Sequence, residues 1–213
     1  RKLHNTQWGY ICPSETPEGH GVGVVKNMSS TAIVSIYSNP NTVRDYIATM
    51  KKLIPLNKCN AEEKHTQTRI FVNGAWLGIF KNKDALTVLE TLRYAKRSGR
   101  IHVQTGIIWR AALREIWITT EAGRMLRPLF YANTIREIAS DTSGTLAHHI
   151  NSLKTWEQLM IWESPAKNHL IEYIDPGETE SSYIAVWPAD IIQHADRSYT
   201  HAELHPSTIL GTL

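Results

Sequence analysis

The sequence predicts an α+β fold built from small mixed modules rather than from one regular sheet. Strand-like and helix-like stretches follow one another without the regular strand–helix–strand alternation of a parallel sheet. No internal repeat or low-complexity tract is visible. The chain has 213 residues, of which 42% are hydrophobic and 20% charged, which suits one large globular domain or two or three small ones.

The N-terminal residues are rich in turns, because two prolines and four glycines punctuate residues 1–23. The β-branched residues between Val22 and Tyr37 predict strands that enter a core. A helix is expected over 42–53, opened by Asn39-Pro40-Asn41, because apolar residues recur there at helical spacing. The polar residues 57–68 are expected to form a loop.

The clearest local signal is a hairpin. Two apolar runs within Arg69–Phe80 flank Asn73-Gly74, a dipeptide that tolerates the positive φ angles of a type I′ turn. Apolar spacing then predicts a helix at about 84–98, which Gly99 is well placed to end.

Residues 115–132 are predicted to form strands. Glu115–Thr119 and Met125–Ala132 read as two strands joined by a turn at 121–124. The polar and weakly patterned residues 133–149 are expected to form a loop or a short insertion.

The C-terminal third predicts shorter elements. Ser152 is positioned to cap a helix over 153–162. Leu170–Ile174 is a short apolar element of open type, and the acidic residues 175–180 predict a turn. Ser182–Trp187 reads as a strand that ends at Pro188.

The two chain ends bear on the class of protein. No apolar run approaches the roughly 20 residues that span a bilayer, so no membrane span is expected. Arg1–His4 has no initiator Met, signal core or targeting pattern, and the chain closes on the apolar stretch Ile209–Leu213. We therefore expect an internal fragment of a longer protein.

The net charge and the two cysteines restrict the possible functions only weakly. A net charge of +3 and a pI near 8.8 permit contact with DNA or RNA without arguing for it, because a free-standing nucleic-acid binder usually has a stronger local excess. Cys12 and Cys59 lie far apart and form no C-x-x-C pair. A disulfide framework or cysteine-based zinc site is not expected, and a reducing compartment fits.

A glycine cluster, Gly19–Gly23, is the first candidate binding motif. Exposed backbone N–H groups in such a cluster can bind phosphate. The dinucleotide fingerprint fails, however, because Val24 stands where its third glycine is required, and no Walker A pattern exists. The spacing favours a loop that needs tight turns, with phosphate binding as the alternative.

Glu15 and Glu18 form a carboxylate pair three residues apart. Paired carboxylates can serve acid–base or metal chemistry. The favoured interpretation is that each accepts backbone hydrogen bonds in a loop restrained by proline.

Two further motifs carry charge. His201 and His205 are spaced to share a helix face and ligate zinc, but Pro206 disfavours helical geometry at His205, so no metal site is predicted. Arg93, Lys96, Arg97 and Arg100 make a cationic stripe, for which a solvated face is the default and a phosphate or subunit contact the alternative.

One stretch carries the interpretation further. Arg1–Gly19 reads RKLHNTQWGYICPSETPEG, and Gly23–Asn27 reads GVVKN. This stretch closely resembles the fork region of the second-largest subunit of multisubunit DNA-dependent RNA polymerases. Arg69–Gly78 resembles the R-x-F-V-N-G-x-W-x-G hairpin of that family's first external domain.

The later matches follow in the family's order. Thr120–Arg124 with Arg127–Phe130 resembles the next strand pair, Glu172–Asp175 resembles the second external domain, and His201–Gly211 resembles the start of the hybrid-binding region. The pattern is similar to eukaryotic and large-DNA-virus subunits more than to bacterial ones. A short second external segment favours a viral lineage.

The resemblance implies four segments. Residues 1–40 correspond to the C-terminal part of the fork, 41–118 to an external 1-like domain, 119–200 to an external 2-like domain, and 201–213 to a truncated start of the hybrid-binding region.

It also implies three residues near nucleotide or nucleic acid. Arg1 matches an arginine just after a fork loop that borders the template, and Glu18 matches a glutamate close to the incoming nucleotide. His20 takes a position usually filled by Gln or Pro, and Gly21 departs from the family pattern as well.

The implied activity is nucleotidyl transfer by a DNA-directed RNA polymerase in transcription. The aspartates that hold the catalytic Mg²⁺ belong to the largest subunit of the family, and no D-x-D-x-D occurs here. We therefore expect no catalytic residue, metal site or cofactor in this chain and no activity from it alone.

The implied partners are the largest and other polymerase subunits, the DNA template and the RNA–DNA hybrid, and no membrane. The implied location is the nucleus for a cellular protein, or a cytoplasmic viral factory or virion for a viral one. The alternative function is a non-catalytic scaffold that binds other subunits or factors.

Overall fold

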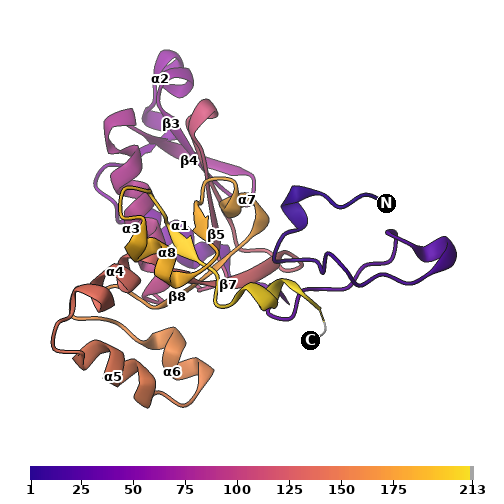
Figure 1. The fold of residues 1–213 in the computed structure, drawn as a ribbon. Coiled ribbons are helices and arrows are strands. Elements are labelled where there is room, and N and C mark those ends of the chain that lie inside the picture. The colour runs from indigo at the N-terminus through magenta and orange to yellow at the C-terminus, as the bar shows by residue number, and fades with distance from the viewer. Residues whose placement is uncertain (212–213) are drawn as a thin grey trace. The chain divides into compact units, whose positions relative to one another are not determined.

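The computed structural model describes residues 1–211, which form two compact units (Figure 1). Unit 1 contains Arg1–Val34, Met125–Pro176 and the residues from Ser182 onward. Unit 2 contains Ser35–Arg124 and Gly177–Ser181. Each unit has its own mixed sheet, which confirms the predicted α+β class of small modules. No described helix is long and apolar enough to cross a membrane.

Unit 2 is a five-stranded sheet in the order β2-β4-β3-β6-β5. Strands β3 and β6 run parallel, and the other neighbours are antiparallel. The strands are β2 Ile54–Pro55, β3 Thr68–Val72, β4 Ala75–Phe80, β5 Gly106–Arg110 and β6 Glu115–Thr119. The helices are α1 Pro40–Ala48, α2 Ala61–Thr66, α3 Ala85–Arg97 and the 3-10 turns η3 Leu56–Lys58, η4 Asn82–Asp84 and η5 Ala111–Leu113.

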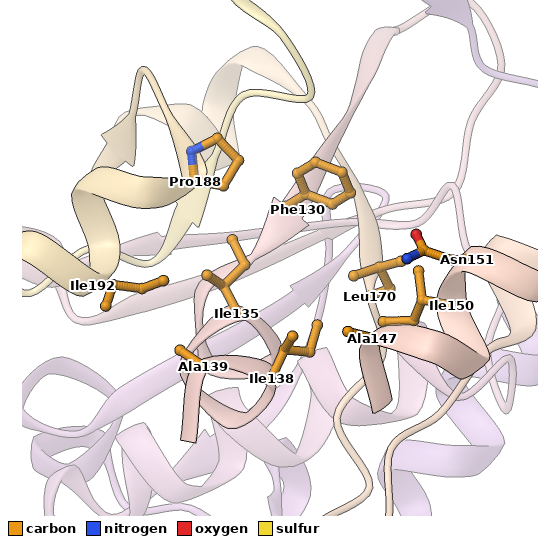
Figure 2. A pocket seen from close by; sticks show the side chains of 10 residues that line it. All are labelled: Phe130, Ile135, Ile138, Ala139, Ala147, Ile150, Asn151, Leu170, Pro188 and Ile192. Carbon is orange, nitrogen blue, oxygen red and sulfur yellow. The ribbon is translucent and has the colours of Figure 1, made fainter. Parts of the chain in front are cut away.

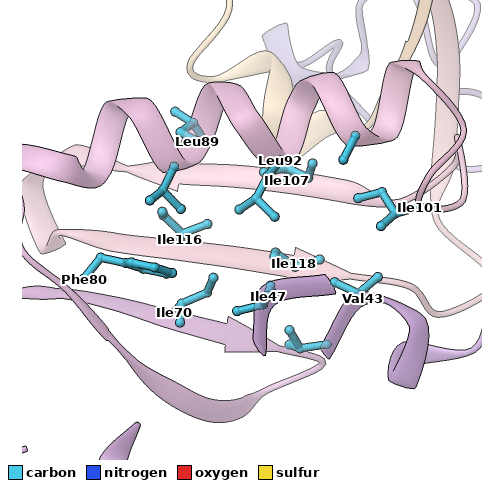
Figure 3. Packing of buried hydrophobic residues seen from close by; sticks show 13 residues of the cluster. Val43, Ile47, Ile70, Phe80, Leu89, Leu92, Ile101, Ile107, Ile116 and Ile118 are labelled. Carbon is cyan, nitrogen blue, oxygen red and sulfur yellow. The ribbon is translucent and has the colours of Figure 1, made fainter. Parts of the chain in front are cut away.

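The core of unit 2 lies between the sheet and the helices α1 and α3 (Figure 3). Helix α3 points Leu89 and Leu92 at the strands, because apolar residues at helical spacing share one face. Ile70 and Ile116 meet them from the neighbouring strands β3 and β6, and all four side chains are buried.

The predicted hairpin is confirmed. Asn73 and Gly74 both have positive φ angles, 48° and 79°, as a type I′ turn requires. The Asn73 side chain exchanges two 2.9 Å hydrogen bonds with Thr120, which fixes the turn to the end of β6. The predicted helix ends at Arg97, followed by Gly99 with a φ of 71°.

Other predictions for unit 2 need correction. The polar stretch 57–68 was predicted as a loop but contains helix α2. Asn60 and Glu63 form a capping box at the N-terminus of this helix. Strand β5 was not predicted. Of the strands expected between Val22 and Tyr37, only β1 Ile33–Val34 forms, and it belongs to unit 1. The helix predicted over 42–53 spans Pro40–Ala48.

Unit 1 is a second five-stranded sheet, in which β7 pairs with three partners along its length. The strands are β1 Ile33–Val34, β7 Met125–Tyr131, β8 Ile171–Ile174, β9 Ile184–Ala185 and β10 His201–Ala202. The helices are α4 Ala132–Ser140, α5 Thr145–Ser152, α6 Trp156–Ile161, α7 Pro176–Thr179 (shared with unit 2), α8 Pro188–Gln193 and the 3-10 turns η1 Asn5–Gln7, η2 Gly19–Gly21 and η6 Pro206–Ile209.

The loop predicted over 133–149 is wrong, because this stretch contains most of α4 and part of α5. Helix α4 buries Ala132, Thr134 and Ile135, so its inward face is small and partly polar. The helix predicted over 153–162 is α6, Trp156–Ile161. It is capped by Thr155, whose hydroxyl accepts from the Gln158 N–H, and not by Ser152.

Strands β6 and β7 do not form the expected pair. Strand β6 pairs with β3 and β5 in unit 2, whereas β7 pairs with β1, β8 and β10 in unit 1. The connection at 121–124 is therefore a crossing between units and not a hairpin turn. The predicted boundaries at residues 40, 118 and 200 stay predictions, and the last two residues of 201–213 lie outside the described part of the chain.

Candidate functional site

Residues 1–28, here called the fork-like segment, form an irregular strap in unit 1 (Figure 1). Its only regular pieces are the short turns η1 and η2. Two backbone hydrogen bonds close it into a loop: Cys12 N–H donates to Asn27 at 2.8 Å, and Ser29 N–H donates to Tyr10 at 3.0 Å. The segment thus returns to its own start and presents residues 13–26 as one long excursion.

The three predicted site residues are all exposed on this strap. The Arg1 guanidinium donates to the His20 carbonyl oxygen at 3.5 Å. The Arg1 backbone also packs against Gly23, where an added Cβ would lie 2.5 Å from the Arg1 carbonyl oxygen. Glu18 directly precedes η2, and within the described residues its carboxylate caps no helix N–H. The structure thus brings Arg1 and His20 together and leaves Glu18 open to solvent on the same loop.

Beside Arg1 lies a pocket of about 140 Å³. Three of its lining residues, Arg1, Lys2 and Lys26, are cations, and Glu15 is the one carboxylate among them. Thr16 braces its rim, because the hydroxyl donates to the Val25 carbonyl at 3.0 Å and accepts from the Gly23 N–H at 2.9 Å. A pocket with this excess of positive charge suits an anionic group.

The predicted bracing role of Glu15 and Glu18 stays a prediction. Within residues 1–211 no backbone N–H donates to either carboxylate. Glu15 is half-buried against Gly211, where an added Cβ would lie 2.7 Å from the carboxylate Oε2.

Cys12 lines the same pocket and is buried. Burial raises the pKa of this thiol, but hydrogen bonds from the backbone of Gly211, Ser14 and Glu15 outweigh it and leave the pKa below its usual value. Sequence reasoning had not assigned Cys12 a role in this pocket.

The strap rests on a buried ion pair that sequence reasoning missed. Arg127 Nη1 lies 2.6 Å and 2.7 Å from the two carboxylate oxygens of Glu203. The guanidinium lies over the Tyr10 ring, 5.3 Å from its centroid, and the Tyr10 hydroxyl donates to the Ile174 carbonyl at 3.2 Å. The two residues are 76 positions apart in the sequence, so no local sequence pattern predicts this contact.

His201 and His205 have different roles in the structure. His201 is buried on β10, with Nε2 3.3 Å from the Glu172 carboxylate. His205 caps η6, with Nδ1 2.6 Å from the Ser207 hydroxyl. Because His201 is in extended backbone, the shared helix face does not exist. No group of three or more metal-binding side chains occurs among residues 1–211.

The cationic stripe on α3 is not a solvated face. Lys96 is buried, and its ammonium lies 2.7 Å from the equally buried Glu178 carboxylate. Arg93 pairs with Glu90 at 3.2 Å. The remaining members are Arg97, whose side chain is 7% exposed, and Arg100, which lies over the Tyr94 ring. The default interpretation of this stripe is therefore wrong, since its central lysine belongs to the core of unit 2.

A second cavity in unit 1 is almost wholly apolar (Figure 2). It has a volume of about 320 Å³ and lies among α4, α5, α8 and the strand end at Phe130. Asn151 is the only polar residue in its lining, so the cavity lacks the converging polar groups of a catalytic site.

Comparison with known protein families gives matches in three stretches. A family described as RNA polymerase Rpb2, domain 3, matches residues 1–34. Domain 4 of the same protein matches residues 70–133, and domain 5 matches residues 162–206. The order of the three domains is the order of the chain.

Individual relatives agree. The chain is 33% identical over its whole length to the DNA-directed RNA polymerase II subunit RPB2 of Schizosaccharomyces pombe and 32% identical over 99% of its length to that of Eremothecium gossypii. It is 29% identical over its whole length to DNA-directed RNA polymerase subunit 2 of Acanthamoeba polyphaga mimivirus. These identities do not separate a viral from a cellular lineage.

The chain spans about a fifth of the length of these relatives. The shared stretch includes the fork-like segment, the hairpin of unit 2 and strand β7. With three consecutive domains matched, the chain belongs to the Rpb2 family of second subunits of DNA-directed RNA polymerases.

Proposed function

We propose that this chain forms part of the wall of the nucleotide-addition site in a DNA-directed RNA polymerase. In this proposal the fork-like segment borders the incoming nucleotide and the RNA–DNA hybrid, and the two sheets serve as its scaffold. The observation that carries the proposal is the anchored strap that holds Arg1 and His20 together beside a pocket with three cations.

The charges of the strap suit this place. Arg1, Lys2 and Lys26 can contact phosphates of the template or hybrid without reading base identity. Glu18 has the opposite charge and would repel a triphosphate unless a metal ion or an arginine intervenes. We therefore assign Glu18 a tuning role in nucleotide binding and no role in bond formation.

Catalysis is assigned to another subunit. Phosphoryl transfer in polymerases uses two metal ions held by carboxylates, and the resemblance places those aspartates in the largest subunit. Mg²⁺ would supply charge stabilisation there, while this chain orients nucleic acid. The isolated chain is expected to add no nucleotide to a primed template in the presence of Mg²⁺, and measurable extension would contradict this assignment.

The proposed partners are the largest and other polymerase subunits, together with template DNA and the hybrid. The strap exposes large apolar side chains, including Leu3 (61%), Trp8 (51%) and Val24 (65%), which suits protein surfaces of the assembled enzyme. The proposed location follows the lineage: the nucleus for a cellular enzyme, and a viral factory or virion for a viral one.

The alternative function is a scaffold whose fork-like segment has no role in nucleotide addition. The two are separated by single-nucleotide addition kinetics of the assembled polymerase with Glu18→Ala or Arg1→Ala. We expect either change to alter the rate or the fidelity by about threefold or more, with assembly intact, because Arg1→Ala removes a charge that attracts phosphate and Glu18→Ala removes one that repels it.

The matched control is Glu121→Ala, which removes an exposed carboxylate from unit 2. It should leave both rate and fidelity unchanged. Unaltered kinetics in both strap variants would favour the scaffold.

A further inference from the structure

We propose that the buried Arg127–Glu203 pair positions the fork-like segment through Gly9 and Tyr10. The inference rests on the proposed function, because it says how the strap is held where nucleotide and hybrid would pass. Arg127 and Glu203 are here positioning residues and touch no substrate.

The ion pair sits in the interior of unit 1. Arg127 lies on β7 beside Ile174 of β8, and its side chain is 3% exposed. The Glu203 side chain is 6% exposed and follows directly after β10. Two elements that are distant in sequence thus hold one guanidinium in a fixed orientation.

The strap closes over this guanidinium without spare room. At Gly9, which has a φ of 76°, an added Cβ would lie 2.3 Å from Arg127 Nη1 and 2.5 Å from its Cζ. Tyr10 then covers the guanidinium with its ring and is only 1% exposed. Because Gly9 and Tyr10 fit only when the guanidinium keeps this orientation, the strap position depends on Glu203.

Stability alone does not explain the choice of charged residues. Desolvation offsets most of the attraction within a buried ion pair, and apolar replacements of similar volume are often as stable. Arg127 Nε is moreover buried with no hydrogen-bond partner within the described residues, which is a further cost. An apolar side chain could not make directional contacts with both Glu203 and Tyr10, as the Arg127 guanidinium does.

The position of Tyr10 is passed on to the exposed part of the strap. The Tyr10 carbonyl accepts from the Ser29 N–H, and Cys12, two residues further on, donates its N–H to the Asn27 carbonyl. These bonds fix both ends of the excursion that carries Glu18 and His20. Loosening Tyr10 therefore frees both ends of the excursion together.

The test compares two glycine variants in the full-length subunit within the assembled polymerase. Gly9→Ala adds a methyl group against Arg127, whereas Gly144→Ala adds one at a similar φ of 68° with nothing within 4 Å. Both carry the same left-handed backbone cost. Glu203→Gln is the second perturbation, because it removes the charge and keeps the shape.

Two readouts are measured on each variant: hydrogen exchange of the amides of residues 1–28, and the KM and kcat for the incoming nucleotide on active-site-titrated enzyme. Gly9→Ala and Glu203→Gln should accelerate exchange by about tenfold or more and raise KM by about threefold or more. Gly144→Ala should change neither. A merely structural role would lower the assembled fraction and leave the KM of the surviving enzyme unchanged.

The outcomes separate this inference from the function on which it rests. If Glu18→Ala alters nucleotide addition but Gly9→Ala and Glu203→Gln leave KM and exchange unchanged, the positioning role is wrong and the proposed function stands. If Glu18→Ala and Arg1→Ala have no effect, the proposed function fails first. Equal effects of Gly9→Ala and Gly144→Ala would overturn the positioning role, since backbone strain alone would explain them.

Discussion

Replacing Lys96 by methionine removes one member of the buried ion pair in unit 2. The ammonium lies 2.7 Å from the Glu178 carboxylate, and the two side chains are 1% and 4% exposed. Glu178 also accepts from the Ile107 N–H of β5 at 3.0 Å. Methionine fills a similar volume, so the main change is that the Glu178 carboxylate in the core loses the ammonium group of Lys96.

The expected loss in the free energy of unfolding is about 3–5 kcal/mol, because removing one partner of a buried ion pair is strongly destabilising. This loss cannot greatly exceed the free-energy cost of protonating the carboxyl group, because the variant can bind a proton there and avoid a buried charge. For an ordinary glutamate pKa near 4.3, protonation at pH 7 costs about 3.7 kcal/mol, and at pH 5 it costs about 1 kcal/mol. We therefore expect a loss of about 3–4 kcal/mol at pH 7 that shrinks on acidification to pH 5.

Native-state hydrogen exchange of the β5 amides in the 213-residue chain measures this loss within unit 2. The control is Lys52→Met, which breaks an ion pair of the same 2.7 Å length whose lysine is 50% exposed. The control should be indistinguishable from wild type, as exposed pairs contribute little. A Lys96→Met loss no larger than that of the control, or one that does not shrink at pH 5, would refute the reasoning.

Two further predictions concern local structure. Asp141 accepts hydrogen bonds from Ser143 and the Leu146 N–H, which lower its pKa to about 2. This folded-state pKa lies below the unfolded value of about 3.9. The stabilisation of α5 by Asp141 should therefore be present above about pH 4 and be lost as the pH falls through about 2. Circular dichroism of the wild type and of Asp141→Ala across this pH range measures the effect. Gly74→Ala should destabilise the hairpin by about 1 kcal/mol, because Gly74 has a φ of 79°, although an added Cβ meets nothing within 4 Å. Faster exchange at β3 and β4 would confirm this, and an unchanged rate would contradict it.

Local signals in the sequence predicted the elements that local forces determine. The Asn73-Gly74 turn needs only two residues with positive φ, and helix α3 needs only its apolar face and a glycine stop. The strap was predicted as turn-rich for the same reason. Helix α4 was missed, because its buried face is short and includes the polar residue Thr134.

The missed features depend on contacts between distant residues. Nothing near Lys96 shows that Glu178, 82 residues away, pairs with it, so the stripe read as a solvated face. The separation of β6 and β7 into different units likewise depends on partners such as β5 and β8. At the candidate site, the resemblance predicts Arg1, Glu18 and His20 as site residues, but it does not predict the pair of Arg127 and Glu203 beneath the strap.

The central claim is that the fork-like segment borders the nucleotide-addition site. The most direct measurement is photocrosslinking in the assembled polymerase from a nucleotide analogue that carries a photoreactive group and is bound opposite the template. We predict that crosslinks within this chain map to residues 1–28 and weaken when unlabelled nucleotide competes. Crosslinks confined to Ser35–Arg124, or crosslinks to other subunits with none to the strap, would contradict the claim.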